Sequence, residues 1–218
     1  MTTVTFDKSR TQERFKRLAE YVQQARISPE SFDCEHERLG ECSATLTMDL
    51  RPLQPKNCGG LMHLGEEFDV NVDGTPLRIL FVGKDYGTGN SDLTARRDCI
   101  RSLGETDLNW HYKGVVKTLL EIYQCRRDDG WQPLLARMAQ TNATRCCAPR
   151  DNKMKCNTNY KTRLNCWPHF RAEIEILEPT VMIFHGADLR SPFNECLKLE
   201  GIEVRQPLSG CEHCRLIR

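Results

Sequence analysis

Two short, continuous apolar runs are the clearest structural signal along the chain. LRILFVG, at residues 77–83, and TVMIFHG, at residues 180–186, each lead from branched apolar residues into a glycine. Runs of this length and composition are typical of strands buried in a parallel sheet. A weaker strand is predicted over residues 135–144, and a last one over residues 201–207.

Segments with helical periodicity lie before and between these strands. Residues 9–26 place four apolar side chains on one side of a helix: Phe15, Leu18, Tyr21 and Val22. Further helices are predicted over residues 113–125, 165–177 and 188–199, and Pro168 falls in a first turn, where proline is tolerated. Strands that alternate with helices predict an α/β fold, a three-layer α/β/α arrangement around a short central parallel sheet.

Residues 30–65 show neither pattern and include Pro52, Pro55 and the pair Gly59-Gly60. An irregular stretch of that length needs an anchor, and a metal bound by its cysteines would provide one. We therefore expect residues 1–65 to form an N-terminal helix with a cysteine-bearing extension. Residues 66–218 are expected to form one compact α/β domain.

Composition narrows the class of protein. The 218 residues include 31 Lys and Arg against 30 Asp and Glu, and this balance excludes a globally basic nucleic-acid binder but not a local basic face. No apolar run approaches the roughly 20 residues of a membrane helix, and the N-terminus lacks the apolar stretch of a secretory signal. We expect a monomeric, cytoplasmic, nucleoid-associated protein without membrane contact.

The 12 cysteines are unusual for such a protein. Structural disulfides are rare in a reducing compartment, so metal binding is a better explanation than an oxidised scaffold. Cys99, Cys125 and Cys196 lie in helix-like patterns and are expected to be buried thiols that act as small hydrophobes.

In parallel sheets, chemistry lies beyond the carboxyl ends of the strands. The first such loop, Gly83–Asn90, has glycines that let the backbone approach a ligand, and Asp85, which can orient a water molecule. The loop is neither a Walker A motif nor a dinucleotide fingerprint. It could also be a plain glycine-rich turn in which Asp85 caps a helix.

The second loop begins at Asn142, whose amide can pair with the edge of a nucleobase or, alternatively, bond its own backbone in a turn. Cysteines at both ends of the following segment could fix that segment to an iron–sulfur cluster, because such clusters are held by four thiolates.

Together, these segments resemble the uracil-DNA glycosylase superfamily, especially its iron–sulfur members of the family 4 and family 5 type, from about residue 58 to residue 186. The matching motifs, in chain order, are FVGKDYG, Asn142-Ala143-Thr144-Arg145-Cys146, Cys166-Trp167-Pro168-His169-Phe170 and LEPTVMIFHG.

The resemblance implies a DNA glycosylase that acts in base excision repair. Such an enzyme hydrolyses the N-glycosidic bond of uracil or another modified base after that base has been flipped out of the DNA. The resemblance assigns Asp85 to water activation and places Tyr86, Tyr112 and Asn142 around the base. It also implies a 4Fe-4S cluster on Cys42, Cys58, Cys146 and Cys166, with Cys34 and Cys147 as alternative ligands.

This sequence departs from the family in two places. The N-terminal Cys-x-x-Cys pair is absent, and so is the closing His-Pro-Ser-Pro motif, whose nearest equivalent begins at Gln206. His185 or His213 could replace the missing histidine as a catalytic group.

Basic residues near these loops suit contacts with DNA phosphates, although each could be ordinary solvated surface: Arg96, Arg97, Arg101, Lys153, Lys155, Lys161 and Arg163. Two other functions fit the sequence. One is a non-catalytic nucleic-acid-binding member of the same fold, and the other is an interaction protein that binds zinc.

Overall fold

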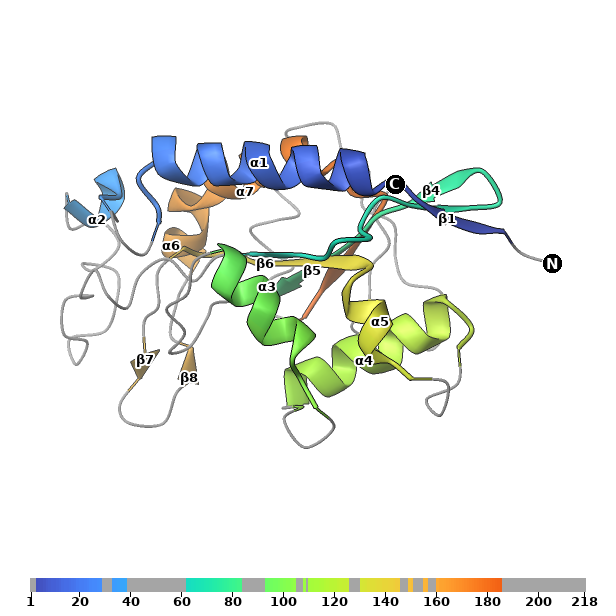
Figure 1. Ribbon diagram of the computed structural model, residues 1–218. Helices are drawn as coiled ribbons and strands as arrows, with labels where there is room; N and C mark the ends of the chain where they lie inside the picture. Colours follow the sequence, from blue (N-terminus) through green and yellow to red (C-terminus); the bar gives the residue numbers. More distant parts are fainter. Residues whose placement is uncertain are drawn as a thin grey trace.

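A four-stranded sheet in the order β2-β6-β5-β9 lies at the centre of the protein (Figure 1). Three strands run parallel, and the edge strand β2 (His63–Leu64) is antiparallel to β6. The parallel strands are β5 (Ile79–Gly83), β6 (Met138–Asn142) and β9 (Val181–Phe184). The computed structural model describes residues 3–28, 33–38, 62–83, 93–104, 108, 110–125, 130–145, 149–150, 155–156 and 160–185.

β5 and β9 are the strands that the two apolar runs predict, and β6 lies within the weaker predicted strand. Every residue of β5 and β6 is buried, as expected of strands covered on both faces. The strands fall within the predicted ranges 77–83, 135–144 and 180–186. The predicted α/β class is therefore confirmed, whereas the antiparallel edge strand β2 was not predicted.

Helices cover both faces of this sheet (Figure 1). One face packs against α1 (Lys8–Gln24) and α7 (Trp167–Leu177). The opposite face packs against α3 (Leu93–Arg101), α4 (Trp110–Ile122) and α5 (Gln132–Leu135). Two short helices, α2 (Glu35–Arg38) and α6 (Tyr160–Asn165), lie beyond the end of α1 and directly before α7.

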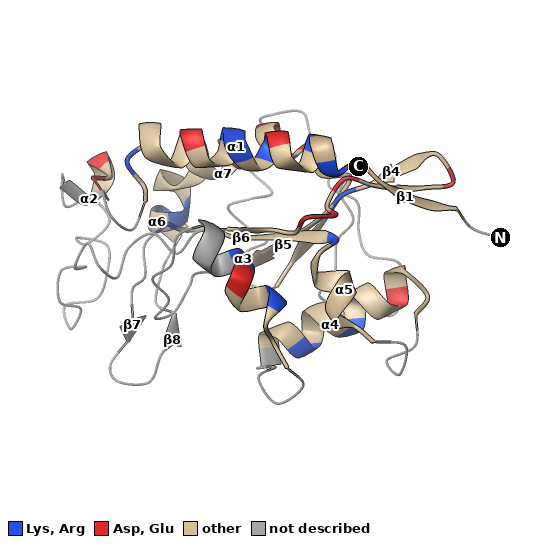
Figure 2. Ribbon diagram, viewed as in Figure 1, with Lys and Arg blue, Asp and Glu red and all other residues tan. Residues whose placement is uncertain are grey.

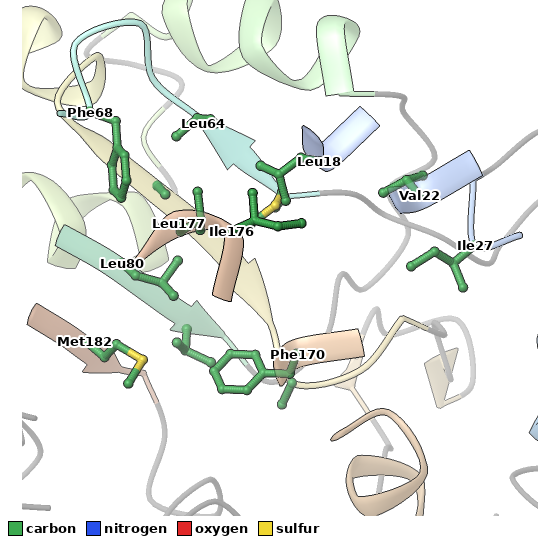
Figure 3. Packing of buried hydrophobic residues seen from close by; sticks show 14 residues of the cluster. Leu18, Val22, Ile27, Leu64, Phe68, Leu80, Phe170, Ile176, Leu177 and Met182 are labelled. Carbon is green, nitrogen blue, oxygen red and sulfur yellow. The ribbon is translucent and has the colours of Figure 1, made fainter. Parts of the chain in front are cut away.

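Figure 3 shows the core between the sheet and α1 with α7. Leu18 of α1, Phe170 of α7 and Leu80 of β5 all belong to this core, and all three side chains are fully buried. Met62 and Leu64 belong to the same cluster. Residues before and after position 65 therefore pack in the same hydrophobic core.

A second, three-stranded antiparallel sheet was not predicted from the sequence. It consists of β1 (Val4–Phe6), β3 (Val70–Val72) and β4 (Thr75–Leu77), and it extends to one side of the central sheet (Figure 1). A further short pair joins β7 (Pro149–Arg150) to β8 (Lys155–Cys156). The elements predicted over residues 188–199 and 201–207 lie outside the described residues.

Two other findings bear on the sequence predictions. Cys99 is exposed and Cys125 is partly buried, so the expectation of a buried thiol is wrong for Cys99. Among the described residues, no helix has both the length and the apolar character needed to span a membrane.

Candidate functional site

The path of the chain marks one position in the central sheet. After β5 the chain passes through α3, α4 and α5 on one face, whereas after β6 it passes through α6 and α7, of which α7 packs on the other face. In open α/β sheets, ligands bind where the connections of neighbouring strands diverge in this way. The last residues of the two strands, Gly83 and Asn142, are partners in the ladder.

Gly83 and Asn142 fit closely together at this switch point. A β-carbon on residue 83 would lie 2.2 Å from Oδ1 of Asn142, so the asparagine side chain occupies the space that the glycine leaves. Asn142 is 3% exposed, and the amide of Ala143 donates to the carbonyl of Gly83 at 2.9 Å. The backbone at Asn142 is therefore fixed by the ladder, and its side-chain amide lies against Gly83.

His185 follows β9 at the same end of the sheet. Its backbone N–H donates to the carbonyl of Val82 at 2.8 Å, which continues the parallel ladder past the last strand residue. Its ring packs edge-on against Phe81, with ring centroids 5.3 Å apart. Burial lowers the pKa of His185 below its ordinary value and so favours the neutral imidazole.

Tyr112 approaches the same region from the first turns of α4. Its ring is 6% exposed within the core between the sheet and α4, and its hydroxyl donates to Oε1 of Gln140 at 2.9 Å. Side chains alternate along a strand, so Gln140 and Asn142 of β6 share the face towards α4. Tyr112, Asn142 and His185, which the sequence selected separately, thus lie on one face at one end of the sheet.

Sequence reasoning missed two residues that connect this group. Nε2 of Gln140 lies 3.0 Å from Nε2 of His111, and Nδ1 of His111 lies 3.1 Å from Nδ1 of His185. The position of Gln140, two residues before Asn142, was an available signal, because it implies the same face of β6. A single histidine next to Tyr112 gave no comparable signal.

Cys166 lies at the N-terminal end of α7 and is 3% exposed. Its sulfur accepts a hydrogen bond from the backbone N–H of Arg145 at 3.4 Å, and Arg145 directly precedes Cys146 in the sequence. The predicted ligands Cys42, Cys58 and Cys146 lie outside the described residues. Within the described part of the chain, no group of three or more His, Cys, Asp or Glu side chains could hold a metal ion.

His169 lies in the first turn of α7, close after Cys166. Burial, together with the charges of Arg145 and His36, lowers the pKa of His169 to about 4. The lowered pKa favours a neutral imidazole at His169. Cys34 is buried, as a ligand of a structural metal would be.

A buried ion pair joins the segment after Asn142 to α7. Nη2 of Arg145 lies 2.6 Å from Oε2 of Glu173 on α7, and the hydroxyl of Thr141 donates to the same oxygen at 2.7 Å. Arg145 and Glu173 are each 1% exposed. Burial raises the pKa of Glu173, and Arg145 opposes this shift.

Lysines and arginines are spread over several elements, among them α1, α3, α4 and α6 (Figure 2), and the predicted DNA contacts differ in their surroundings. The guanidinium group of Arg97 lies over the ring of Phe15, and its Nε donates to the carbonyl of Leu64 at 2.8 Å. Arg163 is 7% exposed, whereas Lys161 is exposed. Lys161 is therefore better placed to contact phosphate than either arginine.

The remaining predicted residues cannot be compared with the structure. Asp85, Tyr86 and Lys153 lie outside the described residues, and so does His213. Arg96 lies in α3 and Lys155 in β8, but their side chains are not among those described.

The described residues near this end of the sheet include the amide of Asn142, the imidazole of His185, whose lowered pKa favours its neutral form, and the buried thiol of Cys166. None of these groups alone specifies a reaction, but an amide and an imidazole N–H can both hydrogen-bond the polar edge of a planar heterocycle. Comparisons with protein-family models, with curated proteins and with solved structures give no significant match.

Proposed function

We propose that this protein is a DNA glycosylase that hydrolyses the N-glycosidic bond of uracil or another modified base. The observation that carries the proposal is the position of Asn142, Tyr112 and His185 on one face at the switch point of the sheet. The sequence resemblance assigns Tyr112 and Asn142 to the base, and His185 is a candidate replacement for the missing catalytic histidine.

The reaction breaks the bond between C1′ of the sugar and a nitrogen of the base, and water supplies the new oxygen on C1′. The sugar carries positive charge as the bond breaks, and the leaving base carries negative charge. Asp85 has the appropriate chemistry to orient the water and to stabilise the sugar cation. Hydrogen-bond donors around the base would stabilise the leaving group.

Asn142 would select the base. Its amide offers one donor and one acceptor, the pattern that complements the edge of uracil. A base with the wrong pattern would leave the buried amide unpaired, at a cost of about 1–3 kcal/mol. The contact with Gly83 supports this role because it limits the directions in which the amide can turn.

An iron–sulfur cluster would be structural and would order the segment between Cys146 and Cys166. The described part of the site is compatible with it, since Cys166 is buried and its sulfur already accepts a backbone hydrogen bond, a contact typical of cluster thiolates. Cys42 or Cys34, Cys58, and Cys146 or Cys147 would complete the ligand set. A zinc ion is the alternative, because it also takes four thiolates.

The proposal is tested by measuring abasic-site formation on oligonucleotides that contain uracil, hypoxanthine or a methylated base, with ordinary cytosine as control. We expect abasic sites with at least one modified base and none with cytosine. DNA binding without any abasic product would favour the non-catalytic module. Bound zinc with no affinity for DNA would favour the interaction protein.

The Asn142→Asp variant tests base selection. It replaces the amide donor with an acceptor and keeps the size of the side chain, so the preferred base should change or the preference should weaken. The measurement is the ratio of cleavage rates on uracil-, hypoxanthine- and cytosine-containing strands for the variant and the wild type. Equal loss on every substrate, or no change on any, would remove Asn142 from base recognition.

A further inference from the structure

A row of hydrogen bonds runs from α4 through β6 to the residue after β9. The Tyr112 hydroxyl donates to Oε1 of Gln140, the other end of that amide contacts His111, and His111 contacts His185. The three distances are 2.9, 3.0 and 3.1 Å, within the normal range for such bonds. Three elements far apart in the sequence are therefore joined by polar side chains.

The direction of the first bond determines the direction of the others. Because the Tyr112 hydroxyl donates to Oε1 of Gln140, the amide nitrogen of Gln140 is the atom that contacts Nε2 of His111. An amide nitrogen only donates, so this Nε2 accepts and carries no proton.

The two histidine tautomers follow from this hydrogen bond. A neutral His111 that lacks a proton on Nε2 carries it on Nδ1, and it donates this proton to Nδ1 of His185. Nδ1 of His185 then accepts, and a neutral His185 carries its proton on Nε2. The lowered pKa of His185, caused by burial, agrees with a neutral ring.

The position of His185 is fixed by contacts of both its backbone and its ring. Its backbone is bonded to Val82, its ring packs edge-on against Phe81, and Nδ1 is engaged by His111. Among the described residues, no hydrogen-bond partner is found for Nε2. The fixed ring thus holds its Nε2–H in one orientation at the carboxyl end of β9.

We propose that Tyr112, Gln140 and His111 are positioning residues that fix His185 as its Nε2–H tautomer, and that this N–H binds an acceptor atom of the ligand. This inference rests on the proposed function only for the ligand, which would be the carbonyl oxygen or ring nitrogen of the leaving base. A neutral donor at that atom stabilises the charge that develops as the bond breaks, and it requires no proton from solution.

NMR of the full chain labelled with ¹⁵N-histidine tests the tautomers directly, because protonated and unprotonated ring nitrogens have well-separated shifts. The spectra of His111→Gln and His185→Gln assign the two rings. We expect Nδ1–H in His111 and Nε2–H in His185. His63 is an internal reference, because its Nε2 lies 3.0 Å from the carbonyl oxygen of Leu135 and must donate to it.

Two variants separate positioning from folding. Tyr112→Phe keeps the buried ring and removes the hydroxyl, and Gln140→Met keeps the approximate length of the side chain and removes the amide. Both should lose the Nδ1–H signature of His111 while His63 is unchanged. Nε2–H in wild-type His111 would overturn the direction of the row, and an unchanged pattern in Gln140→Met would overturn its role.

Titration with free uracil tests the ligand. We expect the Nε2 resonance of His185 to shift while that of His63 stays in place. If the protein forms abasic sites at uracil and this resonance does not respond, His185 does not bind the base. If no abasic sites form on any substrate, the proposed function fails, and the tautomer spectra still decide the positioning role by themselves.

Discussion

The space that a side chain on residue 83 would need is filled by the amide of Asn142. This explains why β5 ends in glycine in the absence of any requirement for an unusual backbone angle. It also makes the pair a sensitive point, because a change at either residue moves the other. The sequence showed a glycine after an apolar run, but only the ladder between β5 and β6 shows what the glycine accommodates.

We expect Gly83→Ala to destabilise the protein by about 1–3 kcal/mol, a typical cost of overpacking. The added carbon would overlap Oδ1 of Asn142, so the amide must turn away and cleavage of the preferred base should fall as well. Denaturant unfolding measures the first effect and abasic-site formation the second. Wild-type stability together with wild-type cleavage would show that Asn142 is not held as described.

Gly114→Ala is the matched control. It makes the same substitution within α4, where no atom of the described residues, apart from the two chain neighbours and the nearby backbone of the helix itself, lies within 4 Å of the added carbon. Alanine favours the helix over glycine by roughly 0.5–1 kcal/mol, so this variant should be more stable than the wild type. Opposite signs for the two variants would separate local crowding from a general effect of alanine.

At the scale of elements, α7 and β6 are joined by polar as well as apolar contacts. The carboxylate of Glu173 on α7 forms an ion pair with Arg145 and accepts a hydrogen bond from the Thr141 hydroxyl. Both charged side chains are almost completely buried. This arrangement fixes the chain that runs from Asn142 towards Cys146. The Arg145–Glu173 pair therefore lies between the two predicted parts of the site, Asn142 for base recognition and the cysteines for the metal.

Removing one partner of a buried ion pair leaves the other charge uncompensated, which typically costs about 3–5 kcal/mol. We expect Glu173→Ala to lose this much in denaturant unfolding. Glu175→Ala is the control on the same helix, since Glu175 is 61% exposed and, within the described part of the chain, forms its ion pair with the exposed Arg171. Its loss should be about 0.5 kcal/mol or less. Similar losses for both variants would contradict a special role for the buried pair.

The sequence predicted the long and strongly patterned elements well. β5 and β9 follow from continuous apolar runs, and α1 from its buried stripe of Leu18 and Val22. α7 also begins as expected, with Pro168 in its first turn. These elements carry their signal within a single window of sequence.

The missed elements are short or depend on distant partners. β2 has two residues, and β1 and β3 have three each, which is too few for a period to appear. β1 pairs with β3, so that Val4 faces Val72, and no local pattern indicates such a pairing. The same limit explains why His111 was missed, since its role depends on a contact with His185 across the fold.

At the scale of the whole molecule, the proposed cluster would join the N-terminal segment to the central sheet. Cys34 and Cys58 precede the sheet in sequence, whereas Cys146 and Cys166 follow β6. A cluster on such ligands closes long loops of chain, and loops of this kind gain most from a cross-link. Loss of the metal should therefore affect the stability of the whole protein as well as the site.

Cys166→Ser tests this expectation. We expect anaerobically purified wild type to be brown and to contain iron, and the variant to lose most of the iron and to unfold at lower denaturant concentration. Cys99→Ser is the matched control, because Cys99 is an exposed thiol on α3 and should not affect metal content. Stoichiometric zinc that Cys166→Ser releases would identify a zinc site instead. Wild-type metal content in Cys166→Ser would exclude this thiol as a ligand, and the buried Cys166 would then contribute to the start of α7 by packing alone.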